Sequence, residues 1–145
     1  MWKTLVGDIM SHPPIVIEPE ATLKEAEALM EEERIRRLPV VDAEGRLIGI
    51  VSRSDVREGL SVSLAGNPYA PDAEEHWLTV ADVMTAEVVT VTPETPLWQA
   101  AELMLKHKIG GLPVVEGDEV VGMITESDIF KLLVQQWRNE MEAAH

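Results

Sequence analysis

The sequence contains an internal repeat, and this feature constrains the fold more than any other. Four motifs of the first half return in the second half at a common offset of 74 residues. The pairs are Asp8-Ile9-Met10 with Asp82-Val83-Met84, Pro19-Glu20 with Pro93-Glu94, Leu29-Met30 with Leu103-Met104, and Leu38-Pro39-Val40-Val41 with Leu112-Pro113-Val114-Val115. Gly49 and Asp55 then match Gly122 and Asp128 at an offset of 73. Such a register indicates two copies of one supersecondary unit, the second shorter by one residue.

Each copy shows the same order of predicted elements. A short extended apolar run, Ile15–Ile17 or Val88–Val91, precedes a stretch with helical periodicity. Two strands joined by a turn follow, and a second helix begins near Asp55 or Asp128. We therefore predict an α+β fold with two β-α-β-β-α repeats. Residues 1–57 are expected to form repeat 1 with an N-terminal helix, 58–79 a linker, and 80–145 repeat 2 with a C-terminal helix.

The start of the first helix in each copy has its own signal. Thr22, followed three residues later by Glu25, is the pattern of a reciprocal capping box. In the second copy, Thr95 is expected to cap the helix and Pro96 to take its first position, where proline is favoured.

Apolar side chains also share a helical face at each end of the chain. These stripes are Trp2, Leu5, Val6 and Ile9 before the first copy, and Phe130, Val134, Trp137 and Met141 after the second. They are compatible with packing inside the molecule. They are equally compatible with a dimer contact, because Trp and Met are favoured at interface cores.

The bulk composition excludes several classes of protein. The formal net charge of −14 disfavours binding to a nucleic-acid backbone. The chain has no cysteine, so it has neither disulfides nor thiolate metal sites, and its four histidines lack metal-ligand spacing. No apolar run approaches the roughly 20 residues of a membrane span, and we expect a cytoplasmic protein without membrane contact. We find no catalytic motif and predict no enzyme activity, no metal and no required cofactor.

The duplicated pattern Asp-x-Met, Leu-Pro-Val-Val and Gly-x-(Val/Ile)-(Ser/Thr)-x-Ser-Asp resembles a tandem pair of CBS domains, or Bateman module, over about residues 6–60 and 80–135. The chain is similar to small stand-alone bacterial CBS-pair proteins, including acetoin-utilisation-like ones. The resemblance implies two repeats packed with pseudo-twofold symmetry and two clefts between them. It also implies binding of an adenosine compound (AMP, ADP, ATP or S-adenosylmethionine), conformational signalling to an unknown protein partner, and a homodimer.

The most pointed candidate site is Ser52-Arg53-Ser54-Asp55, which returns as Thr125-Glu126-Ser127-Asp128. Each motif ends a predicted strand and opens a helix. A carboxylate there could accept both hydroxyls of a ribose, and the helix N-terminus attracts phosphate. The same spacing is also a helix-capping box that needs no ligand. The two roles are compatible, and the resemblance favours Asp55 and Asp128 as ribose ligands with Ser52 and Thr125 beside them.

Further candidates concern the phosphates and the base. Arg36 and Arg37 precede the central strand of repeat 1 and suit phosphate, although they could equally complement a helix C-terminus. Repeat 2 has Gly110 and Gly111 at these positions, so we expect the two clefts to differ. By resemblance, the adenine lies against Ser11, Ile15, Pro39, Thr85, Val89 and Pro113, which could instead be ordinary core strand.

Two functions remain. The first is a non-enzymatic regulatory module that binds an adenosine nucleotide and changes shape for a partner. The alternative is a ligand-free scaffold for dimerisation or protein docking.

Overall fold

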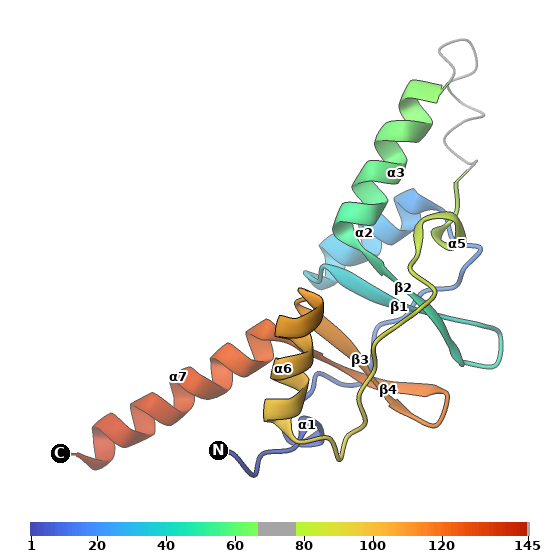
Figure 1. Cartoon of the computed structure of the whole chain (residues 1–145). Coiled ribbons are helices and arrows are strands. Elements are labelled where there is room, and N and C mark those ends of the chain that lie inside the picture. The colour runs from blue at the N-terminus through green and yellow to red at the C-terminus, as the bar shows by residue number, and fades with distance from the viewer. Residues whose placement is uncertain (67–77, 145) are drawn as a thin grey trace. The chain divides into compact units, whose positions relative to one another are not determined.

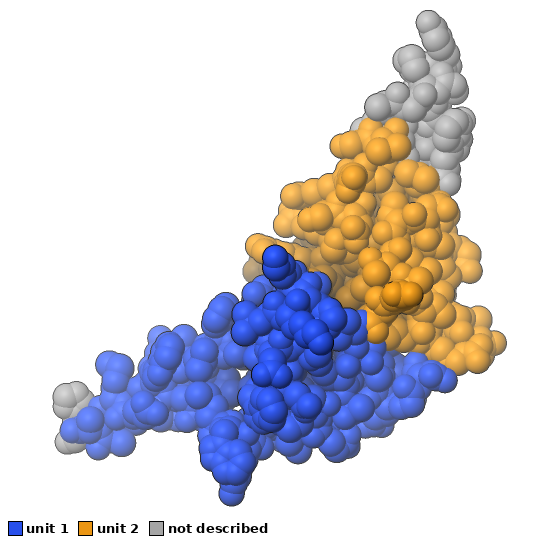
Figure 2. Space-filling view, in the orientation of Figure 1, with its two compact units in different colours: residues 1–14, 89–145 blue, residues 15–88 orange. Residues whose placement is uncertain are grey.

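The computed structural model describes residues 1–66 and 78–144 (Figure 1). The fold is α+β, as predicted, with one two-stranded antiparallel hairpin in each repeat. The chain forms two compact units, which Figure 2 shows in different colours. Unit 2 is the continuous stretch 15–88, whereas unit 1 combines residues 1–14 with residues 89–145. The two ends of the chain therefore belong to the same unit.

Unit 2 contains the hairpin of the first repeat. Its elements are α2 (Leu23–Glu33), β1 (Arg37–Val41), β2 (Leu47–Ser52), α3 (Arg53–Gly66) and α5 (Val80–Val83). The turn between β1 and β2 is held by Asp42, whose Oδ1 accepts hydrogen bonds from the backbone N–H groups of Glu44 (3.0 Å) and Arg46 (2.9 Å). Gly45 takes the positive φ of 81° that the turn requires. Helix α3 covers residues 58–66 of the predicted linker, and residues 67–77 of that segment lie outside the described residues.

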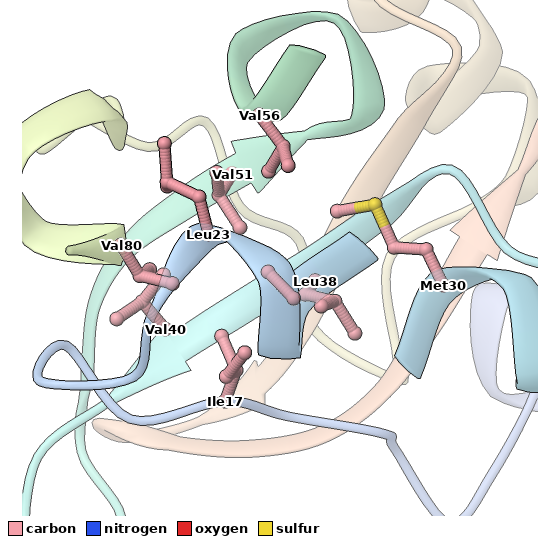
Figure 3. Packing of buried hydrophobic residues seen from close by; sticks show 9 residues of the cluster. Ile17, Leu23, Met30, Leu38, Val40, Val51, Val56 and Val80 are labelled. Carbon is pink, nitrogen blue, oxygen red and sulfur yellow. The ribbon is translucent and has the colours of Figure 1, made fainter. Parts of the chain in front are cut away.

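The core of unit 2 lies between this hairpin and its helices (Figure 3). Its buried side chains are Ile17, Leu23, Ala26, Met30, Leu38, Val40, Val51, Val56 and Val80. They recur at helical spacing in α2, as the sequence predicts, whereas β1 is buried at four consecutive residues from Leu38 to Val41.

Unit 1 repeats this arrangement with the second hairpin. Its elements are α1 (Val6–Ile9), α6 (Leu97–His107), β3 (Gly111–Glu116), β4 (Glu119–Thr125) and α7 (Glu126–Ala143). Its buried core comprises Val6, Val91, Leu97, Ala100, Met104, Leu112, Val114 and Ile124. The first helices of both repeats end alike, because Arg34 and Lys108 occupy their C-caps in the left-handed region with φ of 57° and 55°.

The first predicted strand of each repeat is reduced to a single bridge. Ile17 pairs in parallel with Val40, and Val91 pairs with Val114. The N–H of Ile17 donates to the carbonyl of Pro39 (3.0 Å), and the N–H of Val91 to that of Pro113 (3.1 Å). The predicted strands Ile15–Ile17 and Val88–Val91 are wrong in extent, because only one residue of each joins the ladder.

Of the two predicted helix caps, Thr22 is confirmed and Thr95 is wrong. Thr22 caps α2: its Oγ1 accepts from the N–H of Glu25 (3.1 Å), whose carboxylate accepts from the N–H of Thr22 (3.4 Å). Thr95 does not cap α6, because Pro96 is the N-cap residue and the helix begins at Leu97. Thr95 Oγ1 instead accepts from the N–H of Thr92 (3.0 Å). The first free N–H of α6, on Leu97, donates to the carbonyl of Thr4 (2.8 Å) and needs no side-chain cap.

The segment that opens each repeat packs on the hairpin of the other repeat. Ser11 forms an antiparallel bridge with Met123 of β4, and Thr85 forms one with Ile50 of β2. The Met of each Asp-x-Met motif lies over a glycine. A Cβ on Gly122 would meet Met10 Sδ at 2.8 Å, and a Cβ on Gly49 would meet Met84 Sδ at 2.5 Å. A side chain at Gly49 or Gly122 would clash with this segment, so both positions require glycine.

Candidate functional site

The Ser52 to Asp55 motif of unit 2 lies where β2 passes into α3. Ser52 Oγ accepts from the N–H of Asp55 (3.1 Å), and Asp55 Oδ2 accepts from the N–H of Ser52 (3.1 Å). The capping interpretation is thus correct. It uses only Oδ2, and Oδ1 accepts no hydrogen bond among the described residues. Because Asp55 is only half-buried, that oxygen remains available to a ligand hydroxyl.

The arginines of unit 2 lie beside this helix start. Arg37 is the register partner of Ser52, and the N–H of Arg53 donates to the carbonyl of Arg36 (2.8 Å). A pocket of about 330 Å³ opens here, lined by Met30, Glu31, Arg34, Ile35, Arg36 and Arg53. The structure therefore places Arg36 and Arg37 next to the helix start that holds Ser52 and Asp55, and the contacts of these four residues with a ligand stay predictions.

Two cationic residues of this pocket were not among the predicted ligands. Arg34 and Arg53 line it, and the sequence shows both only as members of local basic groups. Arg34 reaches its place through the left-handed turn that ends α2, which places it next to Ile35 and Arg36 at the pocket. The sequence does not indicate that a residue other than glycine adopts a positive φ, so this placement of Arg34 could not be predicted from it.

In the corresponding motif of unit 1, the carboxylate accepts more hydrogen bonds. Asp128 Oδ2 accepts from the N–H (2.9 Å) and the hydroxyl (3.1 Å) of Thr125. Asp128 Oδ1 accepts from the hydroxyl of Ser11 (3.2 Å). Both oxygens of Asp128 therefore have protein partners, whereas Asp55 Oδ1 in unit 2 has none among residues 1–66 and 78–144.

Unit 1 also lacks the arginines. The carbonyl of Gly110 accepts from the N–H of Glu126 (3.0 Å), which repeats the Arg36–Arg53 contact of unit 2. Gly110 and Gly111 are buried and offer only backbone. The two helix starts therefore differ in side-chain chemistry at these positions, and a difference in what they bind stays a prediction.

The predicted base contacts divide between the two units. Pro39 is buried in β1 opposite Ile50, and Thr85 lies against the same residue from the other side. Ile15 is half-buried against the core of unit 2. In unit 1, the analogous set is Pro113 opposite Met123, with Ser11 and Val89. Ser11 thus belongs to the same unit as Asp128, and Thr85 belongs to the same unit as Asp55. The contacts of all these residues with a ligand stay predictions.

Two hairpin-and-helix repeats, each with a helix-capping carboxylate at the end of its hairpin, define a duplicated α+β fold. The CBS domain model matches residues 6–62 and 80–135, and the chain belongs to the CBS domain family.

Solved structures of CBS pairs resemble this chain over most of its length. A putative acetoin utilization protein from Vibrio cholerae is 35% identical, with a TM-score of 0.80 and coverage of 95% of this chain and 96% of that one. The CBS domain pair of protein MJ0100, in complex with 5′-methylthioadenosine and S-adenosyl-L-methionine, is 32% identical, with a TM-score of 0.78 and coverage of 92% and 98%. CBSX2 in complex with AMP is 28% identical, with a TM-score of 0.75 and coverage of 90% and 96%.

Enzymes among the relatives match over only a part of their length. An L-aspartate semialdehyde sulfurtransferase of Methanocaldococcus jannaschii is 33% identical over 130 residues, which are 89% of this chain and 23% of the enzyme. The chain thus spans about a quarter of this relative. Within residues 1–66 and 78–144, no helix has both the length and the apolar character needed to cross a membrane.

Proposed function

We propose that this chain is a non-enzymatic regulatory module that binds an adenosine nucleotide and signals its occupancy by a conformational change. One observation carries the proposal: in unit 2, a carboxylate oxygen that accepts no hydrogen bond from the described residues lies at a helix N-terminus beside an arginine-lined pocket. A carboxylate so placed can accept hydrogen bonds from the 2′- and 3′-hydroxyls of a ribose. Adenosine ligands bound by two CBS-pair neighbours support this assignment.

We assign the phosphorylated ligand to unit 2. Arg34, Arg36 and Arg53 line its pocket, and guanidinium groups bind phosphate oxygens in bidentate geometry. The first N–H groups of α3 add the positive end of the helix dipole. The single acidic residue of the pocket wall, Glu31, leaves a net positive lining. AMP, which is bound by the neighbour CBSX2, has the matching charge.

We assign a less charged adenosine compound to unit 1, if that site is filled. The two glycines at the positions of Arg36 and Arg37 provide no cationic side chain there. A ribose at Asp128 must also displace the Ser11 hydroxyl, which exchanges one hydrogen bond for another and lowers the net gain. 5′-methylthioadenosine and S-adenosylmethionine lack phosphate, and both are bound by the MJ0100 pair.

The remaining proposed contacts hold the base. Ile15 in unit 2 and Val89 in unit 1 are half-buried and supply apolar surface, whereas Pro39 and Pro113 are fully buried and are proposed only to lie behind that surface. The N–H groups of Thr85 and Ser11 already donate to the carbonyls of Ile50 (2.8 Å) and Met123 (2.8 Å), so at these two residues only the carbonyl oxygens could accept a further hydrogen bond from the adenine edge. Both units have such apolar and main-chain groups. They would therefore account for binding of adenosine in either unit, but not for a preference of one unit for a phosphorylated ligand.

The alternative function is a ligand-free docking scaffold. Its support is that both capping boxes are complete without any ligand. In that case the motif only stabilises α3 and α7, and the repeats serve to present a surface to another protein.

Isothermal titration calorimetry with AMP, ADP, ATP, S-adenosylmethionine and 5′-methylthioadenosine separates the two functions. Saturation at about 100 times Kd adds about 2.7 kcal/mol to the free energy of unfolding, so a parallel thermal-shift series should rise by roughly 5–10 °C. We expect Arg36→Gln to weaken the phosphorylated ligands while leaving 5′-methylthioadenosine unchanged. Absence of heat and of a thermal shift with every compound would establish the scaffold instead.

A further inference from the structure

The carboxylate of Asp128 in unit 1 is hydrogen-bonded by a residue from the other end of the chain. The hydroxyl of Ser11 donates to Asp128 Oδ1 (3.2 Å) across 117 residues of sequence. Within the part of the chain that the structure describes, this is the only side-chain hydrogen bond between residues 1–14 and residues 89–144. Five hydrogen bonds between backbone groups join the same two segments. The segment is thus already held by its backbone, and the bond from Ser11 adds a contact at a proposed ribose acceptor.

Unit 2 has no equivalent of this bond, although its backbone has the same arrangement. Thr85 takes the place of Ser11 at the repeat offset of 74. It exchanges backbone hydrogen bonds with Ile50 (2.8 and 2.9 Å), as Ser11 does with Met123 (2.8 and 3.0 Å). Thr85 also carries a hydroxyl, but within the described part of unit 2 that hydroxyl donates no hydrogen bond to Asp55. The side-chain bond is therefore a property of unit 1 alone.

The two carboxylates differ in how many further hydrogen bonds they can accept. A carboxylate offers about four lone-pair positions. Asp128 accepts two hydrogen bonds from Thr125 on Oδ2 and one from Ser11 on Oδ1, so about one position is left. From the described residues Asp55 accepts only the N–H of Ser52, so about three positions are left. A ribose diol needs two positions. Asp55 can accept both hydroxyls at once, and Asp128 cannot while Ser11 is bonded to it.

This difference changes what each unit gains from the 2′-hydroxyl of a sugar. Ser11 is exposed, so its hydroxyl can turn to water when a ribose displaces it. The second sugar hydroxyl then replaces one hydrogen bond to Asp128 by another of the same kind, and the net gain is small. A sugar with a single hydroxyl uses the free position and leaves Ser11 in place. Unit 1 should therefore bind the two sugars almost equally, whereas unit 2 should prefer the ribose.

We propose that Ser11 makes unit 1 tolerant of the sugar, so that this unit binds 2′-deoxyadenosine compounds as readily as adenosine compounds. Ser11 acts as a specificity-determining residue, because its hydroxyl competes with the 2′-hydroxyl for Asp128 Oδ1. Unit 2 lacks this competitor and keeps the distinction between the two sugars. The inference rests on the proposed function, since it concerns the same carboxylate and the same class of ligand.

Calorimetry with adenosine and 2′-deoxyadenosine tests the proposal, and neither compound carries a phosphate for the arginines of unit 2. The background is Asp55→Asn, which weakens sugar binding in unit 2 and keeps the cap of α3. In this background we expect the two Kd values to agree within about threefold. Adding Ser11→Ala should lower the Kd for adenosine about tenfold and change that for 2′-deoxyadenosine by less than about twofold. The matched control is Ser61→Ala, an exposed serine on α3, which should change neither.

A double-mutant cycle in urea tests the bond between Ser11 and Asp128 without any ligand. Ser11→Ala should raise the equilibrium constant of unfolding about tenfold in the wild-type chain. The same substitution should raise it by less than about twofold when Asp128 is already replaced by Ala. The two tenfold factors should agree, because both experiments measure the loss of the same hydrogen bond. Circular dichroism should show Ser11→Ala folded, because the side chain is exposed.

The outcomes separate this inference from the proposed function. Additive effects in the urea cycle overturn the role of Ser11, whatever the ligand does. A Ser11 that only holds the segment would lower stability and leave the ratio of the two Kd values unchanged, which also overturns it. Absence of binding in Asp55→Asn, at concentrations that saturate the wild-type chain, shows that unit 1 takes no sugar and overturns the inference alone. Absence of binding of both nucleosides and of AMP by the wild-type chain overturns the proposed function as well.

Discussion

Asp55 is proposed to do two things with its two carboxylate oxygens, and one substitution separates them. Oδ2 accepts from the N–H of Ser52 (3.1 Å) as part of the cap of α3, and Oδ1 is left for the ribose. Asp55→Asn keeps an amide oxygen for the cap but replaces the charged acceptor that faces the ligand. We expect the free energy of unfolding to fall by no more than about 1 kcal/mol, since the substitution keeps the hydrogen bond and removes only a negative charge near the positive end of the helix dipole.

The binding free energy should fall much more than the stability. A hydrogen bond to a charged group contributes about 1.5–3 kcal/mol, so the Kd for AMP should rise roughly 10- to 150-fold in Asp55→Asn. Asp55→Ala should lose this affinity and about 1 kcal/mol of stability as well. Calorimetry with AMP and urea denaturation measure the two quantities on the same preparations.

The matched control lies in the same unit. Glu25 makes the equivalent contact in the capping box of α2, where its carboxylate accepts from the N–H of Thr22 (3.4 Å). Glu25→Gln should therefore leave the Kd for AMP unchanged. Wild-type affinity in Asp55→Asn would show that the Asp55 carboxylate acts only as a cap, and the proposed ribose contact would then be wrong.

Three further predictions concern the scaffold. Gly122→Ala should cost about 1–3 kcal/mol in urea denaturation, because the new Cβ would lie 2.9 Å from the backbone oxygen of Ser11; an unchanged midpoint would contradict that close approach. Lys108→Gly should raise the free energy of unfolding by about 1 kcal/mol by removing a side chain from the left-handed region, whereas Lys106→Gly, inside α6, should lower it. The backbone N–H of Arg46 holds the pKa of Asp42 below its usual range, so Asp42→Ala should be destabilised at neutral pH. That deficit should shrink as the pH falls below the ordinary Asp pKa of about 3.9 and vanish below the folded-state pKa; a deficit independent of pH would refute the assignment.

The repeat made most of the fold predictable. Short apolar runs with a turn signal at Gly45 or Gly117 between them specify a hairpin locally, and both hairpins are present. The Ser52 and Thr125 caps follow from a spacing of three residues, and that geometry is also local. Because the candidate site is built around these caps, its carboxylates were predicted together with the helix starts.

Features that depend on distant pairing were not predictable. Nothing in the neighbourhood of Ser11 indicates that it pairs with Met123, because the partner lies in the other repeat. The same holds for Thr95, whose capping role became unnecessary once the carbonyl of Thr4 accepted from the first N–H of α6. The asymmetry of the carboxylates, with Ser11 bonded to Asp128 and no such bond at Asp55, follows from these long-range contacts and not from either motif alone.

The discontinuous make-up of unit 1 sets an order of events during synthesis. Residues 15–88 are complete before β3 and β4 have been translated, whereas Val6, fully buried in the finished protein, has no core to enter until the last strands emerge. At about 5–20 residues per second, the ribosome keeps this amino-terminal segment waiting for several seconds. A released fragment of residues 1–88 should therefore resist protease within residues 15–66 and 78–88 while its first fourteen residues are cut.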